Sequence, residues 1–132
     1  MSQENVEVVT RAIDAVNARD VDRYLSCCTD NVQLSTPAAG VGGVYDGPVG
    51  IRRFFADVAD TAPDFHLHVE RLEAIGPNRV LAFMRMTATG RASGVPTETT
   101  SGNVYDLVGG KIERIRIFPD RNQALETAGL SE

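Results

Sequence analysis

The sequence is poor in cysteine and in long apolar segments, and each shortage excludes a class of protein. Cys27 and Cys28 are the only cysteines, and because they are neighbours they cannot form a long-range structural disulfide. We expect both to be buried as small apolar residues at a helix end. No segment reaches the roughly 20 uncharged residues of a membrane-spanning helix, and no leader segment is recognisable, so we expect a cytoplasmic protein without a membrane partner.

Positive charge is also scarce. Thirteen Lys and Arg residues stand against eighteen Asp and Glu residues, which gives a net charge of −5, and Lys111 is the only lysine. A surface of this charge repels a phosphate backbone overall. The composition therefore predicts no nucleic-acid partner.

The first half of the chain has the spacing of helices. Apolar residues three and four apart predict a helix over residues 2–19, and Asp20 is a typical N-cap for a second, shorter helix. Gly47-Pro48 predicts the start of a third helix, because proline suits the first helical turn. This third helix carries Phe54 and Phe55 toward the core.

The second half has the alternation of strands. The expected strands cover residues 32–36, 65–75, 79–90, 96–108 and 111–118. Thr29-Asp30-Asn31 predicts a turn, the glycine-rich residues 37–43 predict a flexible loop, and Asp120 predicts the start of a last helix ending at Gly129. We expect one α+β domain over residues 1–132, with a cone-shaped, curved, mostly antiparallel sheet packed on three N-terminal helices and a short C-terminal helix.

Three segments carry a family resemblance. The chain resembles the bacterial, polyketide-cyclase-like (SnoaL-like) branch of the nuclear transport factor 2-like superfamily. The resemblance lies in Asn5–Val9 with Ala15–Asp20, in Tyr45–Phe55, and in Gly110–Phe118 followed by Asp120 and Ala124–Leu130. The resemblance implies the cystatin-like cone with an interior pocket. It leaves the function open, because this fold carries isomerases, cyclases, dehydratases, hydrolases and non-catalytic binders.

The catalytic residues of such relatives are mostly missing. The positions that resemble the base, the tyrosine and the aspartic acid of ketosteroid isomerases are Leu34 or Ser35, Ala12 and Asn103. Asn103 alone could still donate a hydrogen bond to a carbonyl or enolate oxygen, although a core amide paired with its neighbours is equally plausible. The Arg-x-Asp of epoxide hydrolases of this fold reads Arg85-Met86-Thr87, without the carboxylate.

Two histidines are the remaining candidates for acid–base or metal chemistry. His66 and His68 are the only histidines, and alternation with Phe65, Leu67 and Val69 places them on the outer face of a strand. No third ligand follows at a recognisable spacing. We therefore expect no metal and no cofactor.

The predicted function is the binding of a small apolar or amphipathic molecule in an apolar pocket. The expected ligand-binding residues are Phe54, Phe55, Leu81, Phe83, Arg85, Asn103 and Tyr105. Arg85 needs an anionic partner if it is buried, either a protein carboxylate or an acidic ligand.

The alternative is an enzyme acting on a cyclic or polyketide-like carbonyl compound. Its candidate catalytic residues are Tyr45, Asn103 and Asp120. Asp120 is equally explained as a helix cap, and Tyr45 as a hydrophobic contact that fixes the entry to the third helix.

We also expect a homodimer through the outer face of the sheet. Ile115 and Ile117 alternate with Arg114 and Arg116, so both faces of the last strand carry side chains that need partners.

Overall fold

The computed structural model describes residues 2–36, 43–89 and 94–130. The helices are α1 (Ser2–Ala18), α2 (Val21–Ser26), α3 (Gly47–Thr61) and α4 (Arg121–Ala128). The strands are β1 (Cys28–Thr36), β2 (Gly43–Asp46), β3 (His66–Ile75), β4 (Arg79–Thr89), β5 (Pro96–Val108) and β6 (Lys111–Phe118).

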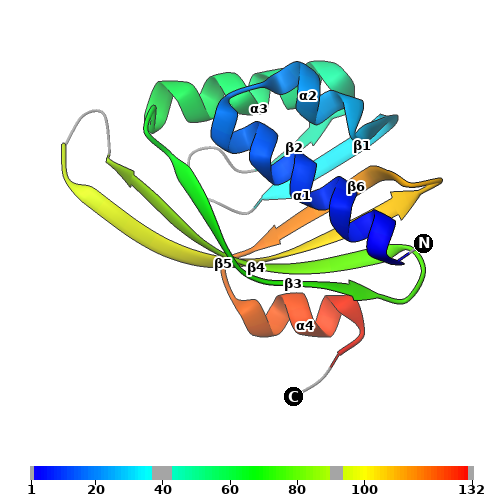
Figure 1. Ribbon diagram of the computed structural model, residues 1–132. Helices are drawn as coiled ribbons and strands as arrows, with labels where there is room; N and C mark the ends of the chain where they lie inside the picture. Colours follow the sequence, from blue (N-terminus) through cyan, green and yellow to red (C-terminus); the bar gives the residue numbers. More distant parts are fainter. Residues whose placement is uncertain (1, 37–42, 90–93, 131–132) are drawn as a thin grey trace.

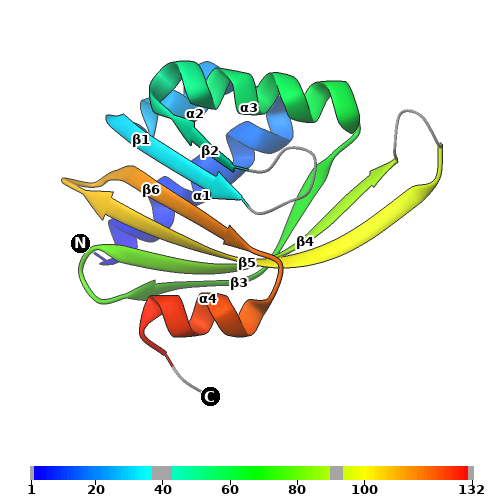
Figure 2. The same cartoon turned by 180° about the vertical axis from the view of Figure 1, so that it is seen from behind.

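The strands form one curved, six-stranded sheet in the order β2-β1-β6-β5-β4-β3. Neighbouring strands are antiparallel, except that β1 and β6 run parallel. The helices α1, α2 and α3 lie over the concave face, and α4 lies against the opposite face (Figures 1 and 2). This arrangement confirms the predicted α+β class, with N-terminal helices on a curved sheet and a short C-terminal helix.

The helix boundaries follow from the predicted caps. The Asp20 carboxylate accepts a hydrogen bond from the Arg23 amide at 3.0 Å, and the Asp120 carboxylate accepts one from the Asn122 amide at 2.9 Å. Each bond satisfies an amide that the first turn of a helix leaves without a partner. Gly129 ends α4 with a φ of 90°, a left-handed conformation that glycine adopts without steric cost.

Apolar side chains are buried on both faces of the sheet. The larger cluster fills the space between the concave face and α1, α2 and α3, and it includes Val9, Ile51, Met84 and both cysteines. A smaller cluster lies under α4, where Leu125 and its neighbours pack against the opposite face. The expectation that Cys27 and Cys28 are buried is confirmed.

The end of α1 is tied to the start of β3. The Asn17 side chain donates to the Leu67 carbonyl at 3.0 Å and accepts from the Leu67 amide at 2.8 Å. The Arg19 guanidinium donates to the carbonyl oxygens of Pro63, at 2.9 Å, and Phe65. These bonds fix Phe65 and Leu67 where the sheet faces the helices.

The structure differs from the prediction between α2 and α3. The strand β1 begins at Cys28, so Thr29-Asp30-Asn31, predicted as a turn, lies within it. The pairing of Cys28 with Ile112 starts the ladder, and an irregularity between Cys28 and Gln33 accommodates the turn-forming residues. The strand β2 was not predicted, and most of the predicted loop 37–43 lies outside the described residues.

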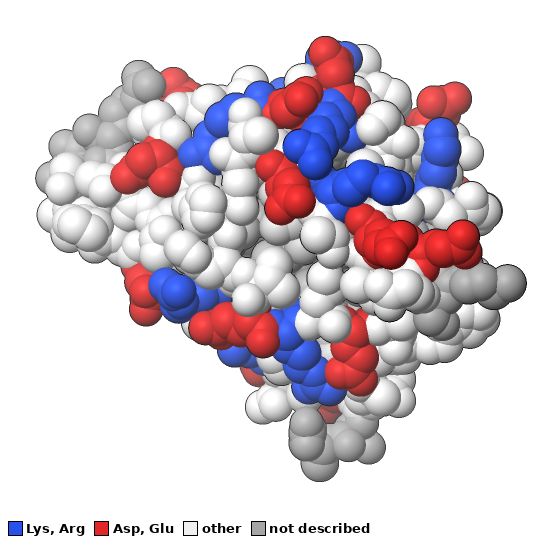
Figure 3. Space-filling model, in the orientation of Figure 1, with Lys and Arg blue, Asp and Glu red and all other residues white. Residues whose placement is uncertain are grey.

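Opposite charges lie next to one another on the surface. Figure 3 shows acidic and basic side chains next to one another over the visible face. Ion pairs on the surface include Arg52 with Asp22 and Arg71 with Glu73, both at 2.6 Å. In the described part of the chain, no helix combines the length and apolarity that a membrane crossing requires.

Candidate functional site: an uncharged cavity under the helices

A cavity of about 350 Å³ lies between the concave face of the sheet and the helices. Three helices and five strands contribute to its wall: α1, α2 and α3, and β1, β3, β4, β5 and β6. The lining residues are Ile13, Val16, Tyr24, Leu34, Thr36, Phe54, Val58, Phe65, Leu67, Met86, Thr99, Thr100, Ser101, Asn103, Tyr105, Ile115, Ile117 and Pro119.

Every described residue of this wall is uncharged. Most of the wall is aliphatic or aromatic, and its polar atoms belong to hydroxyl groups and to one amide. A charged guest in such a site would lose its hydration without gaining an opposite charge, which is strongly unfavourable. The cavity therefore suits neutral molecules.

The polar side chains of the cavity are concentrated on one strand. Ser101, Asn103 and Tyr105 alternate along β5, so all three point toward the cavity. The Ser101 hydroxyl donates to the Asn103 Oδ1 at 3.1 Å, and the Asn103 Nδ2 donates to the Tyr105 hydroxyl oxygen at 3.5 Å. The predicted alternatives for Asn103 are thus combined, because its amide is paired within the protein and also faces the cavity.

A second phenol enters the cavity from α2. Tyr24 is 4% exposed, and its ring packs edge-on against Phe55 with centroids 5.3 Å apart. Burial raises the pKa of Tyr24 well above its usual value, and burial also raises the pKa of Tyr105 to about 12, opposed by the hydrogen bond from Asn103. Both phenols are therefore neutral hydrogen-bond donors at physiological pH.

The tyrosine titration tests this environment directly. We expect the native protein to develop little tyrosinate absorbance near pH 10, whereas the unfolded chain titrates at about that pH. The third tyrosine, Tyr45, behaves alike, because burial and the hydrogen bond to Asp57 raise its pKa, and no tryptophan interferes with the spectrum.

The sign of the linked stability follows from the raised pKa values. The contribution is fully present below pH about 10 and is lost as the pH rises toward about 12, because only the unfolded chain ionises readily in that window. A native protein that titrates all three phenols at the unfolded value would contradict the buried placement.

Three of the predicted ligand-binding residues lie at the cavity. Phe54, Asn103 and Tyr105 belong to its wall. Phe55 does not; it is half-buried behind Tyr24 and meets the Phe54 ring at a centroid distance of 6.1 Å. Phe55 therefore supports the wall from outside.

The other three lie on the opposite face of the sheet, which differs from the prediction. Leu81 and Phe83 pack against α4, and Arg85 continues the same alternation along β4. The residues of β4 that face the helices are those with even numbers, and Met86 among them reaches the cavity. The sequence did not distinguish the two faces because α4 makes both of them apolar.

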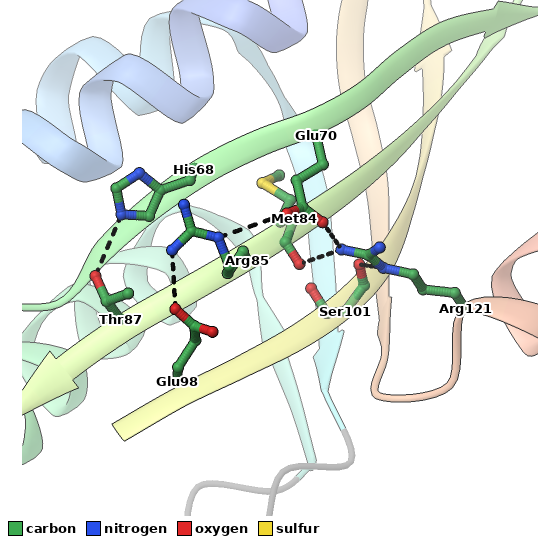
Figure 4. A network of polar contacts seen from close by, with 8 residues as sticks. All are labelled: His68, Glu70, Met84, Arg85, Thr87, Glu98, Ser101 and Arg121. Atoms are coloured by element: carbon green, nitrogen blue, oxygen red, sulfur yellow. Dashed lines mark hydrogen bonds and ion pairs between the residues drawn. The ribbon is translucent and has the colours of Figure 1, made fainter. Parts of the chain in front are cut away.

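Arg85 forms ion pairs with protein carboxylates. Its Nη1 donates to the Glu98 Oε2 at 2.9 Å, and its Nε lies 3.5 Å from the Glu70 Oε2 (Figure 4). Arg121 joins from the start of α4 and donates to the Glu70 Oε1 at 2.6 Å and to the Met84 carbonyl at 2.9 Å. The sequence left open whether a buried Arg85 pairs with a protein carboxylate or with an acidic ligand. The structure shows protein carboxylates beside it.

The histidines lie near this network. The rings of His66 and His68 are 4.6 Å apart, and the His68 Nε2 lies 3.3 Å from the Thr87 hydroxyl (Figure 4). No group of three or more His, Cys, Asp or Glu side chains that could hold a metal ion occurs among the described residues.

The structure does not bring the three candidate catalytic residues together. Only Asn103 lies at the cavity. The Tyr45 hydroxyl donates to the Asp57 Oδ2 at 2.8 Å, and the ring packs on Phe54. Asp120 caps α4.

Sequence reasoning missed several lining residues. Ser101 had a signal, because it shares the alternation of Asn103 and Tyr105. Tyr24 had none beyond its place on the inner side of α2, because only the packing of α2 against α3 and the sheet turns that phenol toward the cavity.

The mixed α+β fold, with N-terminal helices on a curved sheet, is that of a known family of small domains. Residues 9–115 match the family model of the SnoaL-like domain, so the chain belongs to the SnoaL-like domain family. No curated protein matches the sequence.

Solved structures share the fold. An uncharacterized cystatin-fold protein from Novosphingobium aromaticivorans is 28% identical, with a TM-score of 0.75 over 89% of this chain and 98% of that one. TerC, co-crystallised with polyporic acid, is 22% identical, with a TM-score of 0.80 over 96% and 98% of the two chains. An NTF2-like protein of unknown function from Burkholderia pseudomallei is 16% identical, with a TM-score of 0.81 over 93% and 95%.

Proposed function

We propose that this protein binds a small, uncharged, largely apolar molecule in the cavity under α1, α2 and α3. The observation that carries the proposal is the composition of the wall, which is uncharged throughout its described residues and polar mainly along β5. Ligand sites of proteins are apolar hollows with a few fixed polar groups, and their volumes begin at about 300 Å³.

The volume limits the size of the ligand. A space of about 350 Å³ equals the share of roughly a dozen water molecules in the liquid. That room suits a compound of up to about three rings. The co-crystallisation of the fold neighbour TerC with polyporic acid supports a small organic ligand for this architecture.

An enzyme acting on a cyclic or polyketide-like carbonyl compound is the second candidate. The neutral donors Asn103 and Tyr105 favour it, because such groups stabilise charge that develops on a carbonyl oxygen. The described wall holds no carboxylate or imidazole that would act as a general base. Binding alone is therefore the better supported function.

The test uses two valine substitutions in α3. Val58 lines the cavity, whereas Val49, on the same helix, is 80% exposed and outside the wall. We expect Val58→Phe to weaken the binding of the neutral fluorescent dye N-phenyl-1-naphthylamine by roughly tenfold or more, because the new ring occupies the space of the dye. Fluorescence titration measures the dissociation constant.

Val49→Phe serves as the matched control and should bind the dye like the parent protein. Equal losses in the two variants, or no dye binding by the parent protein, would count against the cavity as the ligand site.

The homodimer through the outer sheet face stays a prediction. The region of this face beside α4 carries Arg79, Asp106, Arg114 and Arg116, which leaves it charged rather than apolar. A dimer formed there would be sensitive to salt.

A further inference from the structure

The Tyr24 hydroxyl is a hydrogen-bond donor at the cavity. The residue is 4% exposed and lines the cavity, yet no described residue donates a hydrogen bond to this hydroxyl or accepts one from it. Among the described residues, the Arg116 Nε is the only fully buried side-chain polar atom without a partner, so the Tyr24 hydroxyl is accessible from the cavity. A ligand in the cavity would supply the missing acceptor.

Tyr105, on β5, also has a hydroxyl hydrogen that is free for a ligand. Its oxygen accepts from the Asn103 Nδ2, but its own hydrogen is donated to no described residue. The Asn103 Oδ1 is occupied by the Ser101 hydroxyl, which turns the amide nitrogen toward Tyr105. The sequence of donors thus runs from Ser101 through Asn103 to Tyr105, and the hydrogen at its end is the one left to donate.

The two phenols line the same cavity, Tyr24 from α2 and Tyr105 from β5. A negative charge on Tyr105 would raise the pKa of Tyr24, and burial alone raises the pKa of both. Both hydrogens therefore stay in place at neutral pH, and both are offered to the same cavity.

We propose that Tyr24 and Tyr105 are paired hydrogen-bond donors for one carbonyl oxygen of the ligand, with Ser101 and Asn103 as positioning residues. This inference rests on the proposed function and names its substrate class: neutral ketone-type compounds. A carbonyl oxygen accepts two hydrogen bonds and brings no hydrogen that needs an acceptor of its own. A carboxylate ligand would accept equally well, but no cation stands in the described wall to balance it.

The experiment compares two compounds of nearly equal shape. Benzophenone carries a carbonyl oxygen where 1,1-diphenylethylene carries a methylene group. Each is used to displace N-phenyl-1-naphthylamine from the parent protein and from Tyr24→Phe, Tyr105→Phe and Tyr45→Phe. The last variant is the matched control, because the Tyr45 hydroxyl is bonded to Asp57 outside the cavity wall.

We expect the parent protein to bind benzophenone roughly three- to tenfold more tightly than the hydrocarbon, the usual net value of a neutral hydrogen bond. Tyr24→Phe and Tyr105→Phe should each weaken the ketone by a similar factor and leave the hydrocarbon unchanged, and Tyr45→Phe should change neither.

The infrared band of the bound ketone separates positioning from folding. The carbonyl stretch should lie at lower wavenumber in the parent protein than in either cavity variant. Asn103→Leu and Ser101→Ala should move it partway toward the unbonded value, an effect that a purely structural role would not produce. Tyr24→Phe should leave the melting temperature unchanged, because no internal hydrogen bond is lost.

Three results would overturn this inference while the proposed function stands. They are equal affinity for the two compounds, failure of the ketone to displace the bound dye, and a carbonyl band that stays at the same wavenumber in Tyr24→Phe and Tyr105→Phe. Absence of binding by the dye and by both compounds would overturn the two together.

Discussion

Replacing Gly102 by alanine is expected to lower the free energy of unfolding by about 2 kcal/mol, although it adds only one methyl group. Gly102 lies on β5 where α4 packs against the outer face of the sheet. A Cβ atom at this position would stand 2.5 Å from the Ala124 Cβ and 3.3 Å from the Arg121 Cα. The helix would have to move outward and loosen its contact with Leu81 and Val104. Thermal and urea unfolding measure the loss.

Ala124→Gly provides the matched background, because it removes the Cβ that the new methyl group would meet. Alone it should cost about 1 kcal/mol through helix propensity. In that background Gly102→Ala should cost clearly less than in the parent protein, so the two changes are coupled. Additive costs would show that the close approach of α4 to Gly102 does not determine the stability of this region.

The packing of α4 on the sheet also explains which features of the fold the sequence patterns could predict. Helix spacing and strand alternation are local, and they located α1, α3, the four long strands and both aspartate caps. Strand faces are not local. Along β4 the residues of both faces are apolar, since Val80 and Met84 pack under the N-terminal helices while Leu81 and Phe83 pack under α4. The alternation of residues therefore predicted the strand, but it did not predict which face of the strand points toward the N-terminal helices.

The missed elements depend on pairing between distant segments. The strand β2 has four residues, too few to show a period, and it exists because Tyr45 and its neighbours pair with Leu34 and the rest of β1. The early start of β1 depends likewise on Ile112, far along the chain. Local turn preference at Thr29-Asp30-Asn31 was outweighed by these long-range hydrogen bonds.

The candidate site also has one part that strand alternation predicts and another part that depends on tertiary packing. Asn103 and Tyr105 could be placed together because they share a strand face, whereas Tyr24 joins them only through the packing of α2. The cavity's lack of described charges also arises from tertiary structure, because the charged residues of β3 and β4 all face outward once the inner side is fixed.

A charged cluster on the outer face gives the second large effect. Asp106 lies between two arginines: its Oδ1 accepts from the Arg79 Nε and its Oδ2 from the Arg116 Nη2, each at 2.7 Å. The side chains of Asp106 and Arg116 are 25% and 17% exposed. The Arg116 Nε is buried without a hydrogen-bond partner among the described residues, and burial lowers the pKa of this guanidinium. The single negative charge of Asp106 is thus shared between two positively charged guanidinium groups.

Asp106→Leu is therefore expected to lower the free energy of unfolding by about 3 kcal/mol, because it leaves two half-buried guanidinium groups unpaired beside Arg114. Arg116→Met should cost about 1 kcal/mol or less, since Asp106 keeps Arg79 and the unsatisfied Nε is removed. Urea unfolding of both variants at neutral pH measures the difference. Equal costs would mean that solvent already screens the cluster, and that the asymmetry between its one acid and its arginines has no energetic weight.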